Sequence, residues 1–223
     1  MYLHYPFNFL LMPKLFYYAD LLISVFIGGF LTAVAILMIQ SVNQDKAPHF
    51  KIAFKNSLSR YITVFLITLV IFFLLFYVIK FQKILIGRFL AKKTTGILGF
   101  IRNFWVGGFG YINFLVAIFI QALFAFCIPV VMIEKRPFLG SLRRNFSLLK
   151  SLFLNTFLLI LLPSLLYLPI IILKNNLSVL IDKSSPEITL VVIGAGILFA
   201  IVLDAFITTV ITTLFLLKKD TEA

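Results

Sequence analysis

One acidic residue stands in the middle of a long apolar run. Asp204 is the single charged residue of residues 188–217, and a carboxyl group at the centre of a membrane helix costs about 2.5 to 3.5 kcal/mol to insert. Small and polar residues recur at every fourth position around it, namely Gly196, Ala200, Asp204, Thr208 and Thr212. In a helix this spacing forms one face. Such a face could relay protons, bind a cation, or pack against another helix through hydrogen bonds.

Two earlier apolar runs carry stripes of the same kind. One stripe consists of Asn113, Ala117, Gln121 and Ala125, and the other of Ser24, Gly28 and Thr32. We expect a neutral Asp204 carboxyl to donate to Gln121 or to a backbone carbonyl and so to fix helix packing. The alternative is a proton-relay or cation-binding role at the bundle centre. The candidate intramembrane polar site consists of Asp204, Thr208, Thr212, Gln121 and Asn113.

The chain lacks the residue combinations that are typical of enzyme active sites and metal sites. The single cysteine, Cys127, cannot form an internal disulfide, and it lies in an apolar run where a thiol is usually inert. The two histidines, His4 and His49, lie outside the long apolar runs, so no His/Cys/carboxylate cluster has metal-ligand spacing. Neither HExxH nor GxSxG occurs. We therefore expect a protein that is not an enzyme, with no catalytic, cofactor-binding or metal-binding residues.

The composition requires a lipid environment. Of the 223 residues, 62% are hydrophobic and 13% are charged, against about 25% charged residues in a soluble domain. One water-soluble core could not hide so much apolar surface. The 20 Lys and Arg outnumber the 8 Asp and Glu, and in membrane proteins such an excess lies near the headgroups. No nucleic acid partner is expected, because no soluble domain is left to bind one.

Five runs are long and apolar enough to cross a hydrocarbon core of about 30 Å, which takes about 20 helical residues. They are residues 21–39, 61–79, 107–133, 152–173 and 188–217. The long third run could kink at Pro129, and the fourth could bend at Pro163 and Pro169. The sequence predicts an all-α, polytopic integral membrane helix bundle with about five spanning helices and short interfacial helices, in a single membrane domain (1–223).

Two segments outside the spans are expected at the membrane surface. Residues 1–20 are aromatic and apolar but contain Pro6, Asn8 and Pro13, which favours an interfacial segment over a spanning helix. Residues 82–106 form a basic, mixed segment without a helical stripe. We expect that segment to be a loop that contacts headgroups.

A parallel internal duplication relates the first two spans to the next two. Asp45-Lys46-Ala47-Pro48 aligns with Glu134-Lys135-Arg136-Pro137, and the following residues match after a one-residue slip at His49. Each unit, residues 21–81 and 107–173, holds a helix, an amphipathic connector and a helix. The two connectors should therefore face the same side. A helix-start carboxylate is the expected role of Asp45 and Glu134, and a paired-carboxylate site is the alternative.

Each connector continues into a segment with an apolar and a basic face. Phe50, Phe54, Leu58 and Tyr61 fall within about 80° on a helical wheel, as do Phe138, Leu142, Phe146 and Leu149. This pattern is typical of short interfacial helices with basic residues toward anionic lipid. The alternative is that both segments simply start the spans that follow. The candidate headgroup contacts are Lys51, Lys55, Arg136, Arg143, Arg144 and Lys150.

The segment from Glu134 to Lys150, with its weaker earlier copy, resembles a motif of a broad group of uncharacterised bacterial multi-pass membrane proteins. These proteins are related to the membrane domain attached to some glycerophosphodiester phosphodiesterases. The resemblance covers most of the chain from Leu21 onward. It implies six helices and cytoplasmic motif segments, whereas this chain shows five clear spans, as though the first helix were missing or reduced to residues 2–18. It transfers no catalysis, because no soluble phosphodiesterase domain is present.

The expected function follows from these features. We expect a multi-pass protein of the bacterial inner membrane, without enzymatic activity, that acts in envelope or lipid-associated maintenance or as a partner in a membrane complex. Its partners would be membrane lipids with anionic headgroups and another membrane protein. The alternative is a small permease or ion-coupled transporter that uses Asp204 at the bundle centre.

Overall fold

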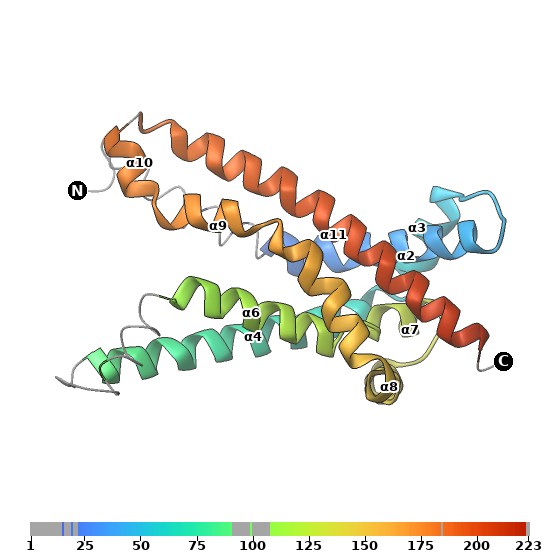
Figure 1. Cartoon of the computed structure of the whole chain (residues 1–223). Coiled ribbons are helices and arrows are strands. Elements are labelled where there is room, and N and C mark those ends of the chain that lie inside the picture. Colours follow the sequence, from blue (N-terminus) through green and yellow to red (C-terminus); the bar gives the residue numbers. More distant parts are fainter. Residues whose placement is uncertain are drawn as a thin grey trace.

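A computed structural model describes residues 15, 19, 22–90, 99, 108–183 and 185–221. The expected interfacial segment 1–20 lies almost wholly outside these residues, as does the second part of the loop expected at 82–106. All regular structure in the described part is helical (Figure 1). The helices are η1 (Ser24–Gly28), α2 (Gly29–Asn43), α3 (Phe50–Ser59), α4 (Tyr61–Leu90), α6 (Phe109–Leu123), α7 (Cys127–Ile133), α8 (Phe138–Leu165), α9 (Leu168–Asn175), α10 (Leu177–Lys183) and α11 (Ile188–Asp220).

Five helical stretches are long and apolar enough to cross a membrane, which confirms the predicted all-α membrane bundle. They are Ser24–Asn43, Tyr61–Leu85, Phe109–Ile133, Phe138–Leu165 and Ile188–Asp220. Four of these stretches start within three residues of the predicted spans. The fourth along the chain starts fourteen residues earlier than predicted. The chain is therefore a multi-pass membrane protein built from helices.

The fourth span was predicted with the wrong limits, at residues 152–173. Helix α8 already begins at Phe138 and ends at Leu165, and α9 begins at Leu168. A proline within a helix removes one hydrogen bond and clashes with the carbonyl four residues earlier. Pro169 is tolerated because it lies in the first turn of α9, where the missing N–H has no intrahelical partner in any case.

The two amphipathic segments differ in how they join their spans. In the first unit the segment is a separate helix, α3, which ends at Ser59 before α4 begins at Tyr61. In the second unit it is the start of α8, whose first turns are seen end-on in Figure 1 while the rest of the helix crosses the picture. The amphipathic segment is therefore a separate helix in the first unit and the start of the fourth span in the second.

The start of the loop expected at residues 82–106 is helical instead. Helix α4 continues to Leu90 and carries Lys80, Lys83 and Arg88 in exposed positions. A helix need not stop where the hydrocarbon ends, because long basic side chains reach the headgroups from a helix end.

The third span is broken before Pro129, as the sequence allows. Helix α6 ends at Leu123 and α7 begins at Cys127. The break is closed by Asn145 of α8, which is fully buried. Its Nδ2 donates to the Leu123 carbonyl at 2.8 Å, and its Oδ1 accepts from the Phe126 N–H at 3.1 Å. One side chain of the second connector segment thus satisfies both backbone groups freed by the break.

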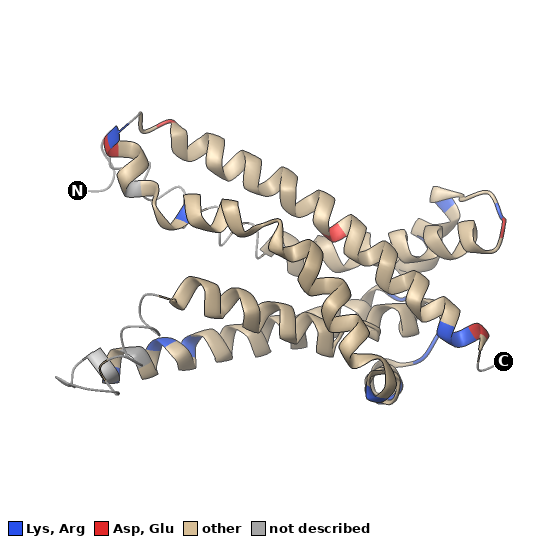
Figure 2. Ribbon diagram, viewed as in Figure 1, with Lys and Arg blue, Asp and Glu red and all other residues tan. Residues whose placement is uncertain are grey.

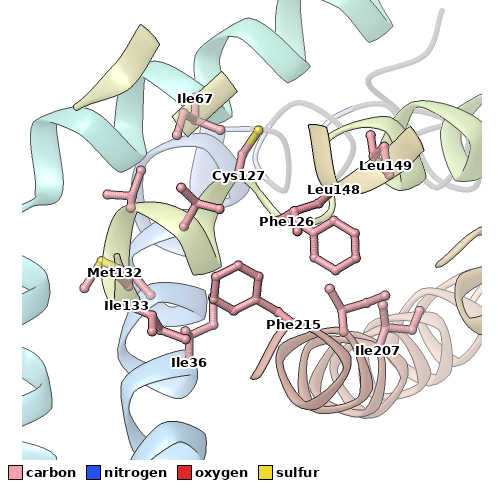
Figure 3. Packing of buried hydrophobic residues seen from close by; sticks show 14 of the residues in the cluster. Ile36, Ile67, Phe126, Cys127, Met132, Ile133, Leu148, Leu149, Ile207 and Phe215 are labelled. Carbon is pink, nitrogen blue, oxygen red and sulfur yellow. The ribbon is translucent and has the colours of Figure 1, made fainter. Parts of the chain in front are cut away.

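The best-packed part of the bundle surrounds α7. Phe126, Cys127, Val130 and Val131 are completely buried, and they belong to one apolar cluster with Ile36 of α2 and Phe215 of α11 (Figure 3). The rings of Phe126 and Phe215 are 6.2 Å apart. Away from this core, α11 with α9 diverges from α4 with α6 (Figure 1). The core therefore holds the bundle together at the end where the connectors lie.

Candidate functional site

Asp204 lies midway along α11 and is exposed among the described residues. Its neighbours one turn away on the predicted stripe, Ala200 and Thr208, are half-buried, and Thr212 is fully buried. The Thr212 hydroxyl donates to the Thr208 carbonyl at 2.7 Å. Helix α11 therefore satisfies this hydroxyl within its own backbone, as membrane helices commonly do.

The expected partners of Asp204 on α6 lie in a different interface. Helix α6 packs against α8 and α4, whereas α11 packs against α2, α8 and α9. Gln121 is exposed, and Asn113 is half-buried with its Oδ1 lacking a hydrogen-bond partner among the described residues. Of the two stripes proposed to face Asp204, the one that includes Thr32 belongs to α2, the helix that does pack on α11. The α6 stripe belongs to a helix that packs against α8 and α4.

A lysine approaches α11 at a depth that the sequence did not indicate. The side chain of Lys174 in α9 lies against Gly196 of α11. A Cβ atom added at Gly196 would lie 3.2 Å from the lysine Nζ. The same Nζ donates to the Tyr167 hydroxyl at 2.9 Å. Gly196 is eight residues before Asp204, or about 12 Å along the helix. The packing of α9 on α11 places this cation beside α11.

The two connectors lie at the same end of the bundle, together with Lys218 and Lys219 of α11 (Figures 1 and 2). Each passes through one residue with positive φ directly after the C-cap of the preceding helix: Asp45 at 54° and Lys135 at 57°. Arg60 Nη1, at the end of α3, donates to the Lys135 carbonyl at 3.2 Å. The end of α3 therefore contacts the second connector, and both connectors lie at the same end of the bundle.

Glu134 does not start a helix as predicted, but caps the end of α7. Its carboxylate accepts from Arg136 Nε at 2.6 Å and from Arg144 Nε at 3.2 Å. The side chain of Glu134 is only 11% exposed, so two of the predicted headgroup cations are held by one nearly buried carboxylate. The positive φ of Lys135 explains the difference, because it turns the chain before α8 begins.

The other four predicted headgroup contacts are exposed. They are Lys51 and Lys55 on α3, and Arg143 and Lys150 on α8. Figure 2 shows basic residues on both connector segments at this end of the bundle. These side chains can reach anionic lipid without first breaking an ion pair with Glu134.

Helix α3 turns its large apolar side chains outward. Phe50, Phe54 and Leu58 are 58%, 41% and 59% exposed, whereas the small Ala53 and Ser57 are buried. The sequence predicts the apolar face correctly but not which face packs on the protein. The small residues let α3 lie close to α2, and the large ones remain for lipid.

Two hollows open near the connectors, and Asp204 and Gln121 line neither. The first, of about 520 Å³, lies between the end of α2 and α3, and we name it the α2–α3 hollow. Its lining residues are Leu37, Gln40, Ser41, Gln44, Lys46, Ala47, His49, Ile52, Ala53 and Asn56. The second, of about 250 Å³, is lined by Met38, Ile39, Val42, Asn43, Pro48, Thr209 and Thr213.

The polar lining of the α2–α3 hollow is a feature that reading the sequence missed. The available signal was the abrupt change at the end of the first span, where Ile39 is followed by Gln40 and Ser41 and then by Asn43 and Gln44. Only the fold shows that these residues face the start of α3 across a hollow.

Comparison of the chain with protein-family models, curated proteins and solved structures finds no match. The function is therefore argued from the geometry of the described residues.

Proposed function

We propose that this chain is a non-enzymatic integral membrane protein that binds anionic lipid headgroups at its connector end and acts in envelope or lipid-associated maintenance. The observation that carries the proposal is helix α3. It exposes Phe50, Phe54 and Leu58 beside the exposed Lys51 and Lys55. A helix with this pattern is stable where acyl chains meet headgroups, because that boundary receives both kinds of side chain.

The charge at the connector end supports the same proposal. Residues 44–60, 134–150 and 218–220 contain eleven Lys and Arg but three Asp and Glu. A cation near an anionic membrane surface contributes about 1 kcal/mol. With the resemblance noted above, this charge leads us to propose that the connectors lie on the cytoplasmic side of a bacterial inner membrane.

We further propose that the two helix pairs arose by duplication and that the chain is related to the membrane proteins that its motif resembles. Each connector has one residue with positive φ directly after the C-cap of the preceding helix, Asp45 and Lys135, which lie one position apart in the alignment, and this similarity supports the duplication. A role as partner in a membrane complex is compatible with lipid binding. Transport through Asp204 has less support, since neither hollow is lined by that residue.

Removing two exposed cations should weaken the binding of anionic lipid. For Arg143→Gln/Lys150→Gln we expect about 30-fold weaker binding of phosphatidylglycerol, since each lost charge removes about 1 kcal/mol. Native mass spectrometry of the detergent-solubilised protein, titrated with the lipid, measures this affinity. Lys80→Gln/Lys83→Gln removes the same charge from α4, away from the connectors. Equal losses in both variants would refute a headgroup site at the connector end.

Removing the carboxylate of Glu134 should have the opposite effect. In Glu134→Gln the charges of Arg136 and Arg144 are no longer neutralised by their partner. We expect phosphatidylglycerol to bind several-fold more tightly, with a steeper dependence on salt. Asp220→Asn removes an exposed carboxylate at the same end of the bundle and serves as the control. Unchanged or weaker lipid binding by Glu134→Gln would contradict the proposal.

A further inference from the structure

The α2–α3 hollow has the size of a ligand site. Its volume of about 520 Å³ falls in the range of about 300–1,000 Å³ that is common for such sites. Leu37, Ile52 and Ala53 contribute apolar surface to its lining, and polar side chains of α2, the first connector and α3 contribute polar surface.

The polar side chains around the hollow supply several hydrogen-bond donors. Lys46 Nζ donates to Gln44 Oε1 at 3.1 Å, so the amide nitrogen of Gln44 is the end left for a ligand, and the ammonium keeps further N–H groups. Gln40 and Asn56 add two more side-chain amides, and none of the described lining residues carries a carboxylate. A ligand with several acceptor oxygens and negative charge fits this lining.

The hollow also lies at the depth where a lipid carries its phosphate. Helix α2 changes from apolar to polar at Gln40, which marks where it leaves the hydrocarbon. The neighbouring helix α3 exposes Phe50 and Phe54 to the same boundary. A phospholipid could therefore place its phosphate among the polar side chains of the hollow and its acyl chains against the exposed phenylalanines of α3.

We propose that the α2–α3 hollow binds one phosphate group, that of a lipid headgroup, through Lys46 and the side-chain amides of Gln40, Gln44 and Asn56. The inference rests on the proposed function, because it takes the connector end to lie among headgroups. It goes further in specifying one saturable site, distinct from the diffuse attraction of Lys51, Lys55, Arg143 and Lys150.

Matched lysine variants test the site. Native mass spectrometry in high salt suppresses diffuse attraction, and should show one retained phosphatidylglycerol per chain. We expect Lys46→Gln to raise the Kd of this lipid at least about tenfold, while Lys51→Gln, the same charge change on α3 outside the hollow, leaves it within about twofold. Asn56→Leu, which changes no charge, should also weaken this one lipid.

Further measurements distinguish a lipid phosphate from free phosphate, and distinguish failure of the site from failure of the proposed function. Dioleoylglycerol, which lacks phosphate, should not bind with one-to-one stoichiometry, and saturable binding by it would overturn the inference. Inorganic phosphate that binds and is lost in Lys46→Gln would support the phosphate site with free phosphate as its source. Equal losses in Lys46→Gln and Lys51→Gln would overturn the site and leave the proposed function standing. A wild-type protein without preference for phosphatidylglycerol at any salt would refute both.

Discussion

Replacing Asn145 with leucine should cause one of the largest losses of stability available to a single substitution in this chain. The side chain is completely buried and bonds both the Leu123 carbonyl and the Phe126 N–H across the break in the third span. Leucine is close to asparagine in size but leaves both backbone groups unpaired. An unpaired buried group costs about 1–3 kcal/mol, so we expect a loss of about 4 kcal/mol and a Tm lower by about 10 °C.

The single cysteine provides the measurement for Asn145→Leu. Cys127 is buried in the folded bundle, one residue after the bond to Phe126, so a thiol-reactive dye labels it only when the bundle opens. The rate of labelling on heating in detergent gives the Tm. Asn155→Leu is the matched control, since Asn155 lies on the same helix but is exposed. An unchanged Tm in Asn145→Leu would show that the break is not held by this side chain.

Hydropathy predicted the number of spans but not where the helices break. A bilayer requires about 20 apolar residues whatever their neighbours are, so the runs around residues 30, 70, 120, 155 and 200 were visible in the sequence. The break between α6 and α7 needs Asn145, which is more than twenty residues away from Leu123 along the chain. The early start of α8 depends on a positive φ at Lys135. Neither feature leaves a signal in local composition.

The candidate sites were predicted unevenly for a similar reason. Exposed lysines and arginines on an amphipathic segment follow from helical periodicity, and Lys51, Lys55, Arg143 and Lys150 are exposed as expected. Which cations are neutralised depends on tertiary contacts, as with Arg144 and Glu134. The stripe on α6 was matched to Asp204 by pattern, but small and polar stripes occur on several helices, and pattern does not say which pair packs.

Helices α2 and α4 approach each other closely at Gly29, and this contact leads to the second large prediction. A Cβ atom at Gly29 would lie 2.4 Å from Thr68 Oγ1 and 3.5 Å from Val64 Cγ1. Leucine there must push the two helices apart, and overpacking costs about 1–3 kcal/mol or more. We expect the Tm of Gly29→Leu, measured by Cys127 labelling, to fall by about 10 °C. Gly194→Leu on α11 is the control, because no atom lies within 4 Å of its Cβ position.

A double substitution distinguishes this steric contact from a general intolerance of side chains at Gly29. In Gly29→Ala, the new methyl meets the Thr68 hydroxyl, which also donates to the Val64 carbonyl at 3.0 Å. Thr68→Ala removes that oxygen, and the atoms left nearest to the methyl are then the Cβ of residue 68 at 3.4 Å and Val64 Cγ1 at 3.5 Å, which is ordinary van der Waals contact. Gly29→Ala should therefore lower the Tm, and Gly29→Ala/Thr68→Ala should recover most of the loss. If the two losses simply add, the close approach of α2 and α4 at Gly29 is wrong.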